Sequence, residues 1–232
     1  MVPLSRAALA ALCVCALVLI AAAPGGADRP ATRVDLGLEP RPPAPVCPEN
    51  CRAVAKVTGF QVLAENGDGD RKALPFRVPF NGMLSSWTIA LSFPTNQQRA
   101  FFNKTWGSPA KARIAVLRRI PRTSPPRYRL IRQTPPRSLT GWFGRTPRFP
   151  VRPPIPVRRG EIIGLTVPTW APAIAIDINK RNRWRASRSP GRCLDEADQR
   201  RGRSHQVRGS RRVYGCRYET ARLLYSARIV RG

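Results

Sequence analysis

Arginine is the residue type that dominates the chemistry available to this sequence. The 232 residues carry 41 Lys and Arg against 13 Asp and Glu, which gives a formal net charge of +28. Many of the basic side chains fall between Lys180 and Tyr218. Guanidinium groups bind phosphate, sulfate and carboxylate through paired N–H donors. This basic segment is therefore the first candidate site, with an anionic cell-wall polymer, an acidic polysaccharide or an anionic lipid surface as its expected partner.

Trp184 lies among three of these arginines, an arrangement suited to stacking combined with charge. The alternative is a solvated loop without a ligand, because abundant arginine is also typical of a GC-rich genome. Nucleic acid would bind such a surface non-specifically and at low salt, through counterion release. The predicted polyanion-binding residues are Arg181, Arg183, Trp184, Arg185, Arg188, Arg200, Arg201, Arg203, Arg208, Arg211 and Arg212.

A second candidate is an acidic turn that resembles a calcium loop. Asn66, Asp68 and Asp70 place side-chain oxygens at alternate positions, as calcium loops do. However, Arg77 occupies the position where an EF-hand carries its bidentate Glu. A polar, Gly-rich turn between strands is the favoured reading, and we expect no cofactor.

Two tryptophans are candidates for stacking on sugar rings. Trp142 and Trp170 would serve an alternative function, that of a carbohydrate-binding or adhesion module whose binding is nearly insensitive to salt. The competing interpretation is partial burial in the core, which is the commoner environment of tryptophan.

The sequence offers little for catalysis. His205 is the single histidine, and no G-x-S-x-G motif is present. Arginines around His205 disfavour the imidazolium that a Ser-His-Asp mechanism requires. Glu161 and Asp177 are the acids expected on central strands, and each more simply pairs with a neighbouring arginine than forms a glycosidase pair. We expect a non-catalytic binding protein, and a secreted hydrolase is the third hypothesis.

The N-terminal residues, 1–27, have the order of a signal peptide. Arg6 precedes an unbroken apolar run, Ala7–Ala23, which is followed by the small residues Gly25 and Ala27. We predict cleavage after Ala27. The alternative is an uncleaved anchor, although the run falls short of the roughly 20 residues that a transmembrane helix needs. The protein is therefore expected outside the cytoplasm, secreted or in the cell envelope.

Four cysteines follow the predicted cleavage site. In an exported protein an even number indicates two disulfides, for which three pairings exist. We favour local pairing of Cys47 with Cys51 and of Cys193 with Cys216. Zinc coordination is the alternative, but the sequence holds a single histidine and oxidation competes outside the cytoplasm.

The elements that must position these residues are mostly strands. Apolar and polar residues alternate in Leu84–Phe93, Pro172–Lys180 and Arg222–Ile229, the period of a strand with one buried face. Prolines confine Pro147–Val157 to a sheet edge or a crossing between sheets. Further strand candidates are Val57–Ala64, Arg113–Ile120, Arg127–Gln133, Leu139–Phe143 and Glu161–Val167.

The predicted fold is all-β, a two-sheet antiparallel sandwich that is jelly-roll-like and carries one short helix. Thr95 and Gln98 form a capping box for that helix, which ends before Gly107. Residues 28–46 are read as a Pro-rich tether and 47–232 as the sandwich domain. Residues 180–218 are read as a long basic insertion loop, closed by Cys193 and Cys216.

Three stretches carry a resemblance to a known group of proteins. The run Pro79–Gly82 leads into Ser86–Ser92, Ile114–Arg118 follows, and Val157–Leu165 has a hairpin pattern. Over these residues the chain resembles exported, uncharacterised β-sandwich proteins of high-GC Gram-positive bacteria. The resemblance implies a jelly-roll-like fold and an extracytoplasmic location, and it carries no activity. The basic segment is the departure from this pattern.

Overall fold

The structure, a computed structural model, describes residues 32–65, 69–194, 197, 200 and 206–231. The predicted signal peptide lies outside the described residues. Five of the candidate residues named above lie outside them as well: Asn66, Asp68, Arg201, Arg203 and His205.

The described chain forms a mostly β, sandwich-like fold, as the alternating pattern predicts. The larger sheet has nine strands and curls into a half-barrel. Its strands run in the order β12 (Arg211–Val213), β6 (Arg127–Gln133), β5 (Lys111–Ile120), β9 (Ile162–Ala171), β2 (Val54–Glu65), β11 (Arg183–Ala186) and β13 (Cys216–Glu219), with β3 (Arg71–Ala73) beside β2 and β7 (Arg137–Ser138) beside β5.

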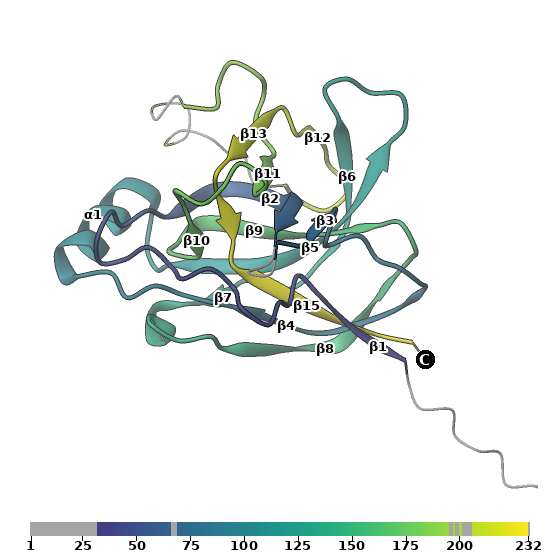
Figure 1. Ribbon diagram of the computed structural model, residues 1–232, viewed down its shortest axis with the longest axis horizontal. Coiled ribbons are helices and arrows are strands. Elements are labelled where there is room, and N and C mark those ends of the chain that lie inside the picture. The colour runs from purple at the N-terminus through teal and green to yellow at the C-terminus, as the bar shows by residue number, and fades with distance from the viewer. Residues whose placement is uncertain (1–31, 66–68, 195–196, 198–199, 201–205, 232) are drawn as a thin grey trace, which may run out of the picture. The chain divides into compact units, whose positions relative to one another are not determined.

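A four-stranded sheet lies below the nine-stranded one in Figure 1. Its order is β1 (Arg33–Leu36), β15 (Tyr225–Val230), β4 (Gly82–Ile89) and β8 (Arg148–Val157). A small third sheet pairs β10 (Ile174–Ala175) with β14 (Arg222–Leu223). All of these strand pairings are antiparallel.

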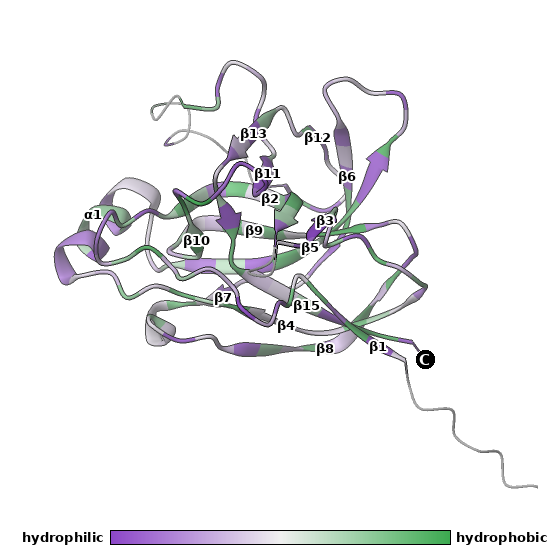
Figure 2. Ribbon diagram, in the orientation of Figure 1, coloured by the Kyte–Doolittle hydropathy of each residue, from purple (hydrophilic) through white to green (hydrophobic). Residues whose placement is uncertain are grey.

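The core lies between the two large sheets. Trp87 and Ile89 of β4 are buried, as their alternation predicts, and so is Ile163 of β9. Tyr225 stacks on Phe76 and donates a hydrogen bond from its hydroxyl to the Ile163 carbonyl at 2.9 Å, which joins β15 to β9. The apolar segments in Figure 2 gather on β2, β9 and β5, whereas β6, β11 and β13 carry hydrophilic residues.

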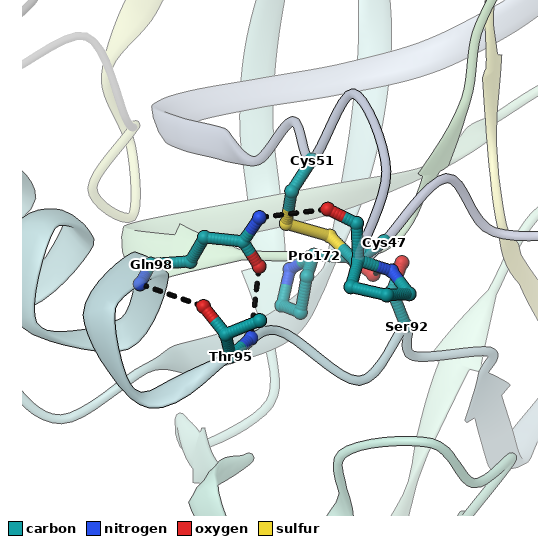
Figure 3. The surroundings of a disulfide bond; sticks show 7 residues. Cys47, Cys51, Ser92, Thr95, Gln98 and Pro172 are labelled. Atoms are coloured by element: carbon teal, nitrogen blue, oxygen red, sulfur yellow. Dashed lines mark hydrogen bonds between the residues drawn. A yellow bond between two sulfur atoms is a disulfide. The ribbon is translucent and has the colours of Figure 1, made fainter.

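The helix and the edge strand follow the sequence expectations. In α1 (Asn96–Trp106) the capping box is complete: the Thr95 hydroxyl accepts from the Gln98 backbone, and the Gln98 side chain accepts from the Thr95 backbone. Gln98 also donates to the Pro48 carbonyl at 2.7 Å, which ties the helix to the Cys47–Cys51 disulfide loop (Figure 3). The proline-rich β8 is the last strand of its sheet, as predicted.

Both predicted disulfides are present. Cys47 is bonded to Cys51, and Cys193 is bonded to Cys216. The first closes the loop that precedes β2, and the second fastens the segment after β11 to β13. No cluster of metal ligands occurs among the described residues.

Three local expectations are wrong. The strand expected over Leu139–Phe143 is absent, and its centre forms a 3-10 helix, η1 (Thr140–Trp142), because the Trp142 amide donates back to the Leu139 carbonyl at 2.9 Å. The predicted strand from Pro172 to Lys180 is limited to β10, because Asp177 has a left-handed φ of 57°. Phe93 is 58% exposed instead of buried, since β4 ends at Ile89.

The predicted tether, residues 28–46, is also wrong over part of its length. Residues 33–36 form β1, whose Leu36 is buried in the core. Asp35 of β1 makes a two-fold ion pair with Arg228 of β15, at 2.8 and 2.9 Å. A short strand thus completes the four-stranded sheet. Its apolar pattern was too weak to predict it, and the ion pair of Asp35 with Arg228 helps to hold it in place.

Candidate functional site

The basic segment is only partly a loop. Residues 183–186, 211–213 and 216–219 form β11, β12 and β13, which extend the nine-stranded sheet on both sides. Within β11, Trp184 and Ala186 are buried while Arg183 and Arg185 are more exposed. The same period-2 pattern that identified the other strands was therefore present here and was obscured by the density of arginines. The loop proper lies between β11 and β12.

Two of the predicted contact residues are buried. Trp184 is 4% exposed and stacks on Tyr218, with ring centroids 4.5 Å apart. Arg188 is 9% exposed and donates hydrogen bonds to the Tyr218 hydroxyl at 2.6 Å and to the Ala55 carbonyl at 2.9 Å. Neither side chain is available as a contact on the protein surface, so the expectation of surface stacking by Trp184 is corrected.

Two other predicted residues are engaged by carboxylates. Arg181 lies 3.2 Å from the Glu65 carboxylate, and Arg183 lies 3.9 Å from that of Glu219. Both contacts lie at the surface, where ion pairs contribute little to stability. Arg200 and Arg208 are exposed.

Arg211 belongs to a row of three arginines on neighbouring strands. It lies directly opposite Arg129 of β6, and Arg129 lies directly opposite Arg118 of β5. Residues opposite each other across a sheet point to the same face, with Cβ atoms about 5 Å apart. Arg118 pairs with the buried Glu161 at 2.6 Å, whereas no ion pair joins Arg129 or Arg211 to any described residue.

A second group of arginines occupies the other face of the same curled sheet. Arg185 of β11 lies directly opposite Arg217 of β13, and its guanidinium donates to the Tyr214 carbonyl at 3.0 Å. The pKa of Arg185 is lowered, mainly because burial disfavours its charged form and further by the positive charges of Arg217 and Arg119. These three guanidinium groups therefore repel one another. Arg212 lies opposite Tyr128 on β6, beside this group.

A small aromatic and polar core holds these strands in place. The rings of Phe60, Tyr128 and Tyr214 contact one another with centroids 4.9 to 5.5 Å apart. The Tyr214 hydroxyl donates to the Gln206 side chain at 2.6 Å, and Gln206 donates to the Tyr128 carbonyl at 3.0 Å. Burial raises the pKa of Tyr214 well above its ordinary value. The arginines are thus mounted on a rigid framework.

We call this set of arginines the basic strand end. Three of its members, on β11 and β12, were among the predicted polyanion-binding residues, and four were not. The signals for three of these four were the Arg118-Arg119 pair at the end of a predicted strand and the exposed position of Arg129 in its strand. The members of the basic strand end are Arg118, Arg119, Arg129, Arg185, Arg211, Arg212 and Arg217.

The tryptophans proposed for sugar stacking have different environments. Trp170 is 1% exposed, packs against Phe102 and Phe143, and donates to the Asn103 side chain at 3.0 Å. It is a core residue and cannot stack on a sugar. Trp142 is 40% exposed and makes an edge contact with Phe149.

The acids weighed for catalysis and for calcium lie apart. Glu161 is buried, accepts from the Arg158 backbone at 2.9 Å and pairs with Arg118, which confirms the arginine pairing expected of it. Asp177 is exposed on the loop after β10. Asp70 is exposed, and the other two calcium candidates lie outside the described residues.

The chain was compared with protein-family models, with curated proteins and with solved structures, and none of the three comparisons found a match. The resemblance to exported sandwich proteins thus stays a prediction. Among the described residues, no helix is both long and apolar enough to cross a membrane.

Proposed function

We propose that this chain is an exported, non-catalytic binding protein that contacts an anionic polymer at the cell envelope through the basic strand end. The observation that carries the proposal is the row of Arg118, Arg129 and Arg211, in which Arg129 and Arg211 lie directly opposite one another and neither forms an ion pair with a described residue. Such pairs are destabilising, and a ligand with negative charges would relieve their repulsion. The two disulfides are compatible with an extracytoplasmic location.

The geometry favours a linear polymer over a flat lipid surface. The row spans three strands, whose separation of about 4.8 Å would set the spacing of its charges. Arg211 and Arg212 are adjacent on the edge strand β12, so their side chains point to opposite faces of the sheet. A flexible chain of phosphodiester or carboxylate groups can pass around this edge and contact both faces, whereas a planar membrane contacts one.

The proposal is tested with poly(glycerol phosphate) immobilised on a sensor surface and the native, disulfide-bonded protein. The variant Arg129→Gln with Arg211→Gln removes two unpaired cations from the row. Each cation near a dense anionic surface contributes about 1 kcal/mol, so we expect affinity to fall about 30-fold. Polygalacturonate, a carboxylate polymer, measured in parallel distinguishes phosphate from carboxylate ligands.

The matched control is Arg137→Gln with Arg145→Gln, which removes the same charge from two exposed arginines outside the basic strand end. We expect its affinity to change less than about 3-fold, since distant exposed charges are screened at physiological salt. Equal losses in the two double variants would show that net charge alone binds the polymer, and the proposal would be withdrawn.

Trp142 supports a second, weaker candidate. It remains exposed where Trp170 does not, so a carbohydrate-binding role would depend on a single aromatic platform. A neutral oligosaccharide that quenches tryptophan fluorescence in the native protein, with equal affinity at low and high salt, and not in Trp142→Ala, would favour this alternative.

A further inference from the structure

A cavity of about 540 Å³ lies beside the sandwich, between α1 and the strands β11 and β13. Its volume falls in the range of roughly 300–1,000 Å³ of small-molecule sites. Cys51 of one disulfide and Cys193 of the other both line it, so cross-links fasten its wall in two places. Phe101 and Trp106 of α1 and Leu194 contribute apolar surface.

Arg188 places a buried positive charge in the wall of this cavity. Its side chain is held by the Tyr218 hydroxyl and the Ala55 carbonyl, both of which are neutral acceptors. Its Nε has no hydrogen-bond partner, and no carboxylate of a described residue lies within ion-pairing distance. A buried cation without a counter-charge is costly. A bound anion would compensate it.

Trp184 adds a second unsatisfied donor to the same wall. Its indole is 4% exposed, and its Nε1 has no hydrogen-bond partner. The ring is fixed by Tyr218 and by close packing against Gly59, where a Cβ would lie 2.8 Å from it. Buried indole N–H groups usually find an acceptor. Two buried donors in one cavity wall thus lack the acceptors that a protein interior normally supplies.

The cavity mouth combines apolar side chains with the exposed Arg52 and with two carboxylates at its rim. Phe101 and Leu194 are 56% and 86% exposed there. The rim carboxylates are those of Asp177, which is exposed, and of Glu219, which already pairs with Arg217 at 3.1 Å. A ligand therefore meets an entrance with apolar and charged side chains and a cationic interior.

We propose that this cavity binds a small amphiphile that has one anionic head group, a carboxylate or a phosphate, on an alkyl body. The head group accepts hydrogen bonds from the Arg188 guanidinium, and the alkyl body packs against α1. This site is separate from the basic strand end, because none of the seven arginines of that set lines the cavity.

The test is isothermal titration calorimetry of the native protein with dodecanoate, dodecyl phosphate and dodecanol, below their micelle concentrations. A hydrogen bond to a charged group favours binding by about 10-fold or more. We expect one site per chain and at least one of the two anions to bind about 10-fold or more tightly than dodecanol. Tighter binding of dodecanoate would indicate a free fatty acid as the ligand, and tighter binding of dodecyl phosphate would indicate a lipid phosphate. Equal affinities of both anions and the alcohol, or no saturable binding, would overturn the proposal.

Two substitutions locate the site. Arg188→Gln should reduce the advantage of the anion over dodecanol to less than about 3-fold. Thr105→Trp, on the cavity side of α1, should fill the cavity and weaken all ligands about 10-fold, whereas Lys104→Trp, at the exposed neighbouring position, should not. If Arg188→Gln loses its near-ultraviolet circular dichroism, that variant is not folded, and Thr105→Trp is then the test of where the ligand binds. Equal weakening by both tryptophan variants would contradict the proposed location.

The polymer proposal and the cavity proposal fail independently. Arg129→Gln with Arg211→Gln should leave the affinity for the amphiphile unchanged within about 2-fold, and Thr105→Trp should do the same for poly(glycerol phosphate). If the row variant abolishes amphiphile binding, the amphiphile is bound by surface charge and the cavity proposal is wrong.

Discussion

Arginines have two different environments in this sandwich. At the N-terminal strand, Arg228 pairs with Asp35 and Arg222 pairs with Glu39. At the basic strand end, Arg129 lies between Arg118 and Arg211, and cation faces cation. The first arrangement consumes the charge inside the fold. In the second, Glu161 pairs with Arg118, and no carboxylate of a described residue forms an ion pair with Arg129 or Arg211.

The comparison shows that the position of an arginine matters more than the number of arginines. An arginine that lies opposite a carboxylate on the neighbouring strand forms an ion pair within the sheet, as Arg228 does with Asp35 of β1. On β12, by contrast, the residue that lies opposite Arg129 of β6 is another arginine, Arg211. A net charge of +28 therefore does not describe the site, because only the cations without a carboxylate partner remain available to a ligand.

The largest effect on stability is expected at the buried pair of Arg222 and Glu39. The Arg222 side chain is 5% exposed, and its guanidinium also donates to the Glu65 carbonyl at 3.3 Å. Glu39→Gln leaves this cation without its carboxylate, so we expect a loss of about 3 kcal/mol in the free energy of unfolding, measured by urea denaturation.

The exposed Glu49 supplies the matched control for that substitution. Glu49→Gln removes the same charge from the surface and should change the free energy of unfolding by less than about 0.5 kcal/mol. An equal loss in the two variants would mean that net charge, and not the pairing of Arg222, sets stability.

A smaller effect is expected at Asp35, and it should depend on pH. The hydrogen bond from Arg228 lowers the pKa of Asp35 below its ordinary value. The ionised form is thus favoured in the folded state, and its contribution is present above about pH 4 and is lost as pH falls through the lowered pKa. Asp35→Asn should cost about 1 kcal/mol at pH 7.

The same denaturation series at lower pH sharpens this prediction. The difference between the native protein and Asp35→Asn should stay constant from about pH 7 to pH 5 and shrink below about pH 4. A difference that does not change down to pH 2 would mean that β1 is held by its backbone pairing and Leu36 alone.

The smallest effect is expected at the row, and its sign is opposite. Like charges that face each other across strands are destabilising, so Arg129→Gln with Arg211→Gln should raise the free energy of unfolding by about 0.5 kcal/mol. The melting temperature should rise by about 1 to 2 °C at low salt, and this increase should vanish in high salt. A loss of stability would show that these arginines support the fold.

Much of the fold could be predicted from local signals in the sequence. These are the alternation of apolar and polar residues along strands, and the cysteine pairs expected of an exported protein. Trp87 and Ile89 are buried as their spacing indicates, and the two disulfides join the cysteines nearest in sequence. β1 was missed because ion pairs with a strand at the far end of the chain hold it in the sheet. The 3-10 turn at Trp142 was missed because an apolar run of that length is compatible with either conformation.

The site could be predicted only as a region. The sequence shows how many arginines are present, but register decides which of them face each other. The register between β6 and β12 places Arg211 opposite Arg129, about 80 positions away. The burial of Arg188 and Trp184 likewise depends on packing against Tyr218 and Gly59. Long-range pairing is the part that no local pattern contains.

The most direct test of the account is the salt dependence of binding to poly(glycerol phosphate), measured from low to physiological salt. The logarithm of the affinity falls with the logarithm of salt concentration in proportion to the number of anions contacted, by about one unit of slope per cation. Arg129→Gln with Arg211→Gln should reduce the slope by about two, while Arg137→Gln with Arg145→Gln should leave it as in the native protein. The same slope in all three proteins would contradict the assignment of the ligand to the basic strand end.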